Sequence, residues 1–181
     1  MKEVFLEGRR IYLRNIGKKH LKGNYIQWFN DQRVCKYNSH GRFPNSRDKM
    51  EIYLKEVNSN NSNLVLAIIY KRGDMHIGNI SLQSIDWISR NAEFAIIMGE
   101  KRFWGRGIAK EAADLILRHG FVELNLHRIY CGTSQDNIPM QRLAVSLVMK
   151  KEGIRRESTF KNGSYRDTVE FGVIRKEFIK I

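Results

Sequence analysis

Residues 96–113 read IIMGEKRFWGRGIAKEAA. This stretch is the most informative about the fold, because it predicts a strand, a tight turn and a helix in immediate succession. The strand character of EFAIIM (93–98) stops at Gly99, and the helix is predicted to begin at Ile108. The turn between them contains RFWGRG (102–107). A helix N-terminus presents unpaired N–H groups and a partial positive charge, and glycines let the backbone curl closely around a ligand. The sequence therefore predicts a phosphate cradle here.

The arginines of this turn narrow the choice of phosphate ligand. Arg102 and Arg106 add two fixed cationic forks. No Gly-Lys-Ser/Thr is present, and the dinucleotide pattern G-x-G-x-x-G would require glycine where Lys110 stands. The remaining pattern, R-x-x-G-x-G between a strand and a helix, resembles the pyrophosphate motif Q/R-x-x-G-x-G/A of the GNAT superfamily of N-acetyltransferases. Taken on its residues alone, the stretch also fits a glycine-rich turn with two exposed arginines.

The order of predicted elements extends the resemblance over nearly the whole chain. Hydrophobic periodicity predicts strands at 10–15, 64–70, 75–82, 93–98, 126–131, 153–160 and 164–174, and helices at about 21–29, 46–57, 108–125 and 137–149. Asn162-Gly163 is typical of a type I′ hairpin turn. Such a mixture predicts one α+β domain, residues 1–181, with a mostly antiparallel twisted sheet flanked by helices in three αβα layers. This order is also that of the GNAT fold.

The composition is that of a basic globular protein. Lys and Arg number 32 against 19 Asp and Glu, a net charge of +13. This balance favours polyanions, among which nucleic acid and coenzyme A are both candidates, and a merely solvated basic surface is a third explanation. No apolar run approaches the length of a membrane span, and the opening MKEVFLEGRR has acidic residues where a signal peptide needs an apolar stretch. We expect a cytoplasmic protein without membrane contact, monomeric or homodimeric.

Metal-binding patterns are absent from the sequence. Cys35 and Cys131 stand far apart, and the five histidines at 20, 40, 76, 119 and 127 show no ligand spacing. Cys131 lies in a strand-like run and is predicted to be a buried apolar residue. We therefore expect no metal.

Three segments resemble one branch of the superfamily more specifically. They are AEFAIIMGEKRFWGRGIAKEA (92–112), LHRIYCGTSQDN (126–137) and EGIRRESTFKNGSYRDTVEFGVI (152–174). The branch is the RimJ/RimL-like one, which includes ribosomal-protein N-terminal acetyltransferases, and Phe171 replaces its usual tyrosine. The resemblance implies acetyl-CoA as co-substrate, held by Ile97, Met98, Gly99, Arg102, Phe103, Trp104, Gly105, Arg106, Gly107, Ile108, Ala109 and Asn137. Asn137 also suits a helix cap, and both roles can hold together.

The resemblance also implies a catalytic carboxylate. Glu93 matches the strand carboxylate used as general base, and an attacking amine, with a pKa of about 8 to 10.4, must lose a proton near neutral pH. The alternative is that Glu93 orders the substrate or pairs with an arginine. The tyrosine that protonates the leaving thiolate in the family is replaced by Ala144. The general acid is therefore unassigned, with Ser146, Tyr165 and water as candidates.

The acceptor is expected to bind the first two helices and the hairpins. Candidate residues are Trp28, Tyr37, His40, Arg42 and Tyr165, and Trp28 fits the core better than the pocket. The stretch NSHGRFP (38–44) resembles acetyltransferases that act on nucleotide-linked amino sugars. We therefore predict transfer to a protein N-terminus or to such a sugar, and polyamines are less favoured for so basic a chain. The rival functions are a nucleic-acid-binding module, which would need exposed aromatics on a basic face, and a CoA-binding protein without catalysis.

Overall fold

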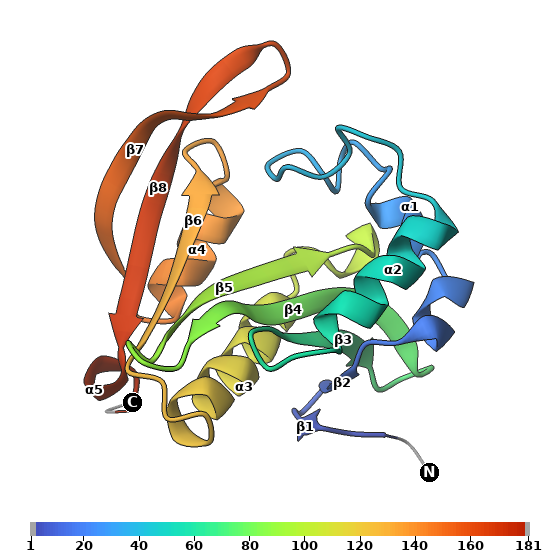
Figure 1. The fold of residues 1–181 in the computed structure, drawn as a ribbon, viewed down its shortest axis with the longest axis horizontal. Coiled ribbons are helices and arrows are strands. Elements are labelled where there is room, and N and C mark those ends of the chain that lie inside the picture. The colour runs from blue at the N-terminus through green and yellow to red at the C-terminus, as the bar shows by residue number, and fades with distance from the viewer. Residues whose placement is uncertain (1–2, 180–181) are drawn as a thin grey trace.

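The structure is a computed structural model that describes residues 3–179, and an eight-stranded sheet forms its centre (Figure 1). The strands are β1 Leu6–Glu7, β2 Ile11–Asn15, β3 Leu64–Tyr70, β4 Met75–Asp86, β5 Asn91–Met98, β6 Arg128–Ser134, β7 Lys150–Lys161 and β8 Ser164–Ile174. Their order across the sheet is β1-β2-β3-β4-β5-β6-β8-β7. Within the described residues, all neighbours pair antiparallel except β5 and β6, so the predicted mostly antiparallel sheet is confirmed.

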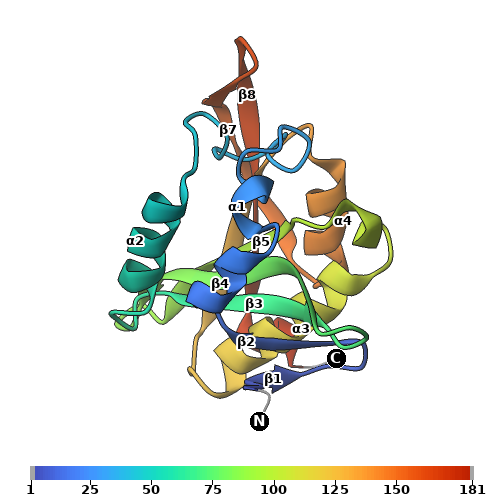
Figure 2. The ribbon, with the colours of Figure 1, turned by 90° about the vertical axis from the view of Figure 1, so that its right-hand side faces the viewer.

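Helices cover both faces of this sheet (Figure 2). They are α1 Tyr25–Trp28, α2 Arg47–Val57, α3 Ile108–Val122, α4 Ile138–Ser146 and α5 Arg175–Phe178, with the short 3₁₀ turns η1 Lys18–Lys22 and η2 Lys101–Phe103. Two separate apolar clusters result. One joins α1 and α2 to the sheet, and the other joins α3 and α4 to its opposite face. The three αβα layers predicted from the sequence are therefore confirmed.

The continuous apolar run of β3 reflects its burial on both faces. Val65, Ala67 and Ile69 pack in the cluster beneath α1 and α2, whereas Leu66 and Ile68 pack in the cluster on the α3 side. Successive side chains of a strand point to opposite faces, so a strand between two helical layers needs apolar residues at every position.

The prediction of a single helix over residues 21–29 is wrong, although the residues predicted to face the core are buried. Leu21, Tyr25 and Trp28 are all buried, but η1 ends at Lys22, and the extended backbone of Gly23 separates it from α1. The hairpin turn between β7 and β8 is as predicted. Asn162 and Gly163 both have positive φ, 52° and 77°, which a type I′ turn requires.

The strands β5 and β6 diverge after a short parallel ladder, and this divergence positions the candidate site. Their parallel ladder pairs only residues 91–93 with 128–130. Beyond Glu93, β5 pairs with β4 alone and β6 pairs with β8 alone. In Figure 1 the two strands diverge from a common point, β6 toward the β7–β8 hairpin and β5 toward the α1 side. Within residues 3–179, the edge of β5 that faces away from β4 therefore has no strand partner over residues 94–98.

Candidate active site

The loop that follows β5 has the backbone that a phosphate cradle needs. Gly105 and Gly107 both have φ of +71°, a left-handed conformation that favours glycine. Gly107 is also the N-cap of α3, and because it has no side chain it leaves the first N–H groups of that helix uncapped. The turn from Trp104 to Gly107 is exposed. These uncapped donors at a helix N-terminus favour an anion.

The predicted cofactor residues in this loop divide into anchors and exposed groups. Phe103 and Ile108 are buried, and the Phe103 ring packs 4.8 Å from the ring of Tyr70. Their side chains fix the loop to the core, so only their backbone is available to a ligand. The guanidinium of Arg102 lies 5.3 Å from the Phe103 ring, and both Arg102 and Arg106 are exposed. Ala109 is half-buried in the first turn of α3.

The end of β5 packs closely on α1. A Cβ at Gly99 would lie only 1.8 Å from the indole of Trp28, so this position has room for glycine alone. Trp28 is 4% exposed, and its Nε1 donates to Glu100 at 3.2 Å. The structure thus places Trp28 in the core beneath the strand end. The carbonyl of Met98 accepts a hydrogen bond from Trp104 Nε1 at 2.7 Å, and Ile97 packs toward the α1–α2 cluster.

Asn137 acts as the N-cap of α4. Its Oδ1 accepts from the N–H of Met140 at 3.4 Å, and its Nδ2 donates to Thr133 Oγ1 at 2.9 Å. The predicted helix cap is therefore confirmed. The amide also lies at the end of β6 that faces the gap, so contact with a ligand stays a prediction.

Glu93 stands where β5 and β6 part. Its neighbours in the strand, Ala92 and Phe94, are buried on the α3 face, so Glu93 projects from the face covered by α1 and α2. The carboxylate is half-buried, and within residues 3–179 no hydrogen bond or ion pair holds it. The carboxylate is therefore available to contact a substrate.

Other polar residues share this face and form what we call the polar strip: Ser81, Gln83, Glu93, Tyr130 and Glu170. Register places Gln83 and Tyr130 on either side of Glu93, and Glu170 opposite Gly132. A Cβ at Gly132 would lie 2.8 Å from Glu170 Oε1, so the Glu170 side chain lies over β6 at Gly132.

The sequence reasoning missed Tyr130 and Glu170. The alternation of side chains along each strand indicates which residues share a face of the sheet. It groups Tyr130 and Glu170 with Glu93 only once the order of β5, β6 and β8 is known.

A bridge joins the loop after α1 to the tip of the β7–β8 hairpin. Arg42 Nη2 donates to the carbonyl of Phe160 at 2.7 Å, and Lys161 Nζ donates to the carbonyls of Asn38 and His40 at 3.1 and 3.0 Å. We call this set of contacts the loop–hairpin bridge.

The bridge gathers several of the predicted acceptor residues. Tyr165 is 61% exposed and packs its ring 5.0 Å from that of Phe160. The structure therefore places the loop that carries His40 and Arg42 against the hairpin tip that carries Tyr165, while the His40 ring packs 4.6 Å from the ring of Phe29. Tyr37 is half-buried on the same loop, with Lys36 Nζ 4.9 Å from its ring.

The general-acid candidates Ser146 and Tyr165 lie on α4 and β8. Ala144 is fully buried, and Ser146 in α4 donates its hydroxyl to the Leu143 carbonyl at 2.7 Å.

Burial, with the nearby charges of Glu170 and Glu93, raises the pKa of Cys131 to about 12. That thiol therefore stays protonated near neutral pH and is a poor nucleophile.

Two further findings concern the described part of the chain. Among residues 3–179, no group of three or more His, Cys, Asp or Glu side chains is placed to hold a metal ion. No helix in that range combines the length and apolar character required to cross a bilayer.

Uncapped donors at a helix N-terminus, a strand edge leading to them and, among residues 3–179, an unpartnered carboxylate beside that edge suit an enzyme that takes its acyl group from an acyl-CoA. The chain belongs to the GNAT acetyltransferase family, because the model of the acetyltransferase (GNAT) domain matches residues 10–150. It is accordingly an acetyl-CoA-dependent N-acetyltransferase.

Individual relatives agree with this assignment. The chain is 29% identical to the uncharacterized N-acetyltransferase p20 of Bacillus licheniformis over 84% of its own length and 86% of that protein. It is 28% identical to the putative ribosomal N-acetyltransferase YdaF of Bacillus subtilis over 56% of the chain and 55% of the relative.

Among solved structures, the chain resembles the spermidine N-acetyltransferase of Vibrio cholerae in complex with CoA and spermine. The TM-score is 0.85 and the identity 25%, and the match covers 94% of this chain and 98% of that one.

Proposed function

We propose that this enzyme acetylates a primary amine by direct attack, with Glu93 as the general base. Acetyl-CoA supplies the acetyl group as an activated thioester. The observation that carries the proposal is the half-buried carboxylate of Glu93, which has no partner among residues 3–179 and lies at the point where β5 and β6 diverge. The α3 cradle favours the pyrophosphate of the co-substrate, and the open edge of β5 favours its amide-bearing arm.

Glu93 has one task in this scheme, which is to take a proton from the amine. A primary amine arrives mostly as an ammonium ion near neutral pH, because its pKa is about 8 to 10.4. Glu93 accepts the first proton, directly or through a water, and the freed nitrogen lone pair attacks the thioester carbonyl. As the C–S bond breaks, the second proton on nitrogen passes to the departing sulfur, directly or through water, which leaves the amide and the CoA thiol. The departing thiolate, with a pKa of about 8.5, can leave without a dedicated acid. The protonated thiol of Cys131 supports direct transfer without an acetyl-cysteine step.

For the acceptor, the loop–hairpin bridge favours a nucleotide-linked amino sugar. It places the cations Arg42 and Lys161 beside the exposed rings of Phe160 and Tyr165. Cationic side chains suit a diphosphate, and exposed rings suit stacking on a base. A protein N-terminus is supported by the RimJ/RimL-like segments of the sequence and by the similarity to YdaF.

A second candidate acceptor is a polyamine. The polar strip holds two carboxylates on one face, Glu93 and Glu170, which suits a substrate with more than one ammonium group. The similarity to the spermidine enzyme bound to spermine favours the same candidate. Against it, Glu170 Oε1 already accepts from Arg155 Nε at 2.6 Å.

A thiol-release assay with a panel of amines tests these proposals. The panel contains a nucleotide-linked amino sugar, a peptide with a free N-terminus, and spermidine. We expect the sugar nucleotide to give the highest kcat/KM. Activity confined to peptides, or to spermidine, would remove the sugar proposal and select the corresponding rival.

Glu93→Gln tests the role of the base, and Glu56→Gln on the exposed side of α2 is its control. Loss of a general base costs about 10²–10⁴-fold. We expect kcat/KM of Glu93→Gln to fall at least tenfold near neutral pH, with acetyl-CoA affinity unchanged. The deficit should shrink at high pH, as more amine arrives neutral. An equal loss at every pH would mean that Glu93 orders the substrate instead.

A further inference from the structure

Arg10, directly before β2, reaches across to the loop that forms the phosphate cradle. Its Nη1 donates to the carbonyl of Arg106 at 2.8 Å, and its Nε donates to Glu111 Oε2 at 2.8 Å. These partners lie 96 and 101 residues away in the sequence. One guanidinium therefore ties the cradle loop, the first turn of α3 and the start of β2 together.

Glu111 completes this connection from the helix side. Its Oε1 accepts the backbone N–H of Arg10 at 2.7 Å, and a Cβ at Gly8 would lie 2.8 Å from the same oxygen. The carboxylate thus lies flat against the backbone before β2. Burial alone would raise the pKa of Glu111, but the N–H and guanidinium of Arg10 outweigh it and lower that pKa. The Glu111 carboxylate is therefore ionised at neutral pH.

Arg10 also stands closer to the cradle than the arginine that opens the sequence motif. Its Nη2 would lie 3.6 Å from a Cβ at Gly107, beside the N-terminus of α3. Arg102, by contrast, lies against the Phe103 ring, with its Nε 3.8 Å from Glu100. The side chain of Arg10 is 34% exposed and that of Glu111 15%, so this ion pair is screened less than a fully exposed one.

We propose that Arg10 is a positioning residue that holds the Arg106–Gly107 loop in the conformation that binds the pyrophosphate of acetyl-CoA. The inference rests on the co-substrate site in the proposed function. Two left-handed glycines leave the loop with many accessible conformations, so an outside anchor is needed to select one. Arginine suits this task because its planar fork reaches two acceptors at once, which the single ammonium of lysine does not.

Calorimetric titration with CoA tests the proposal on four proteins: the unchanged chain, Arg10→Ala, Arg10→Lys and Arg9→Ala. Arg9 is the exposed neighbour and serves as the matched control for charge. We expect Arg10→Ala to bind CoA about tenfold more weakly, equivalent to about 1.4 kcal/mol. Arg10→Lys should recover little of this loss, and Arg9→Ala should bind as the unchanged chain does.

Hydrogen–deuterium exchange without ligand separates positioning from general stability. In Arg10→Ala we expect faster exchange confined to residues 102–109, with β3 and β4 still protected. CoA affinity within twofold of the unchanged chain would overturn the proposal, and so would faster exchange across the whole sheet. Neither measurement needs an acceptor, so a lack of acetyl transfer would count against the proposed function without touching the role of Arg10.

Discussion

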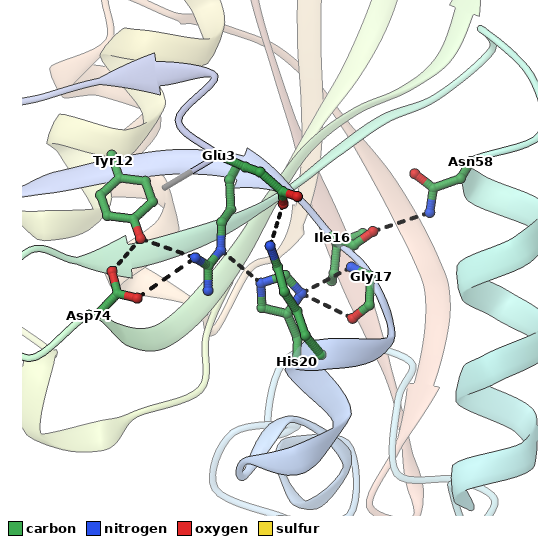
Figure 3. A network of polar contacts seen from close by, with 9 residues as sticks. Glu3, Tyr12, Ile16, Gly17, His20, Asn58 and Asp74 are labelled. Carbon is green, nitrogen blue, oxygen red and sulfur yellow. Dashed lines mark hydrogen bonds and ion pairs between the residues drawn. The ribbon is translucent and has the colours of Figure 1, made fainter. Parts of the chain in front are cut away.

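Acid should destabilise this protein through His20, which is buried in a neutral state. Figure 3 shows the polar network around it. His20 is 4% exposed, its Nε2 accepts from Arg14 Nε at 3.1 Å, and its Nδ1 lies 3.0 Å from the carbonyl of Gly17. Because Nε2 is the acceptor, a proton added there would face the cationic guanidinium. Burial, reinforced by the charge of Arg14, lowers the pKa of His20 to about 4.

The size of the effect follows from that pKa. A histidine in the unfolded chain has a pKa near 6.5. Between pH 6.5 and 4, His20 is therefore mostly protonated in the unfolded chain but mostly neutral in the folded chain. The stability that neutral His20 contributes is therefore complete above pH 6.5 and is lost as the pH falls toward 4. At about pH 4.5 the loss amounts to about 2.5 kcal/mol of the free energy of unfolding. His76, whose ring lies 4.7 Å from that of His20, has its pKa lowered by burial to about 3 and acts in the same direction.

Urea denaturation at about pH 7.5 and about pH 4.5 measures this loss, with His20→Gln as the test and the exposed His127→Gln as the control. Glutamine can keep a donor toward Gly17 and an acceptor toward Arg14, but it does not titrate. We expect the loss on acidification to be about 2.5 kcal/mol smaller in His20→Gln than in the unchanged chain. A loss of equal size in both proteins would refute the reasoning.

Three further substitutions test the site. Gly107→Glu should abolish the rise in melting temperature that CoA produces, because it adds a carboxylate and a strained left-handed residue to the cradle; calorimetry that still finds tight CoA binding would place the cradle elsewhere. Gly99→Ala should lower the free energy of unfolding by about 1–3 kcal/mol, since its Cβ would lie 1.8 Å from Trp28; an unchanged urea midpoint would contradict that packing. Glu170→Gln should raise the KM for a cationic amine about tenfold while acetyl-CoA affinity holds; an unchanged KM would remove Glu170 from the acceptor site.

The parts of the fold that the sequence predicts are those encoded by local patterns. The bounds of β3 and β8 follow from their apolar runs and from Asn162-Gly163, and the two glycines of the predicted cradle adopt a left-handed backbone that glycine favours. The strand predicted at 126–131 is displaced to 128–134. Leu126 instead donates its N–H to the carbonyl of Gly120 at 2.9 Å and ends the turn after α3. Boundaries of this kind depend on tertiary contacts that no local pattern contains.

The candidate site is predictable from sequence only where its members are neighbours in the chain. Glu93 and the cradle lie in one strand–turn–helix unit, and the resemblance of that one segment to the family implies a role for both. Glu170 reaches the same face of the sheet only because β8 pairs with β6, and Arg10 reaches the cradle only because β2 lies beside the start of α3. Each of these depends on pairing between distant segments, which a motif does not specify. The local motif is shared across the family, whichever amine is the acceptor. We therefore expect the residues that distinguish this chain from its relatives to lie in such long-range contacts.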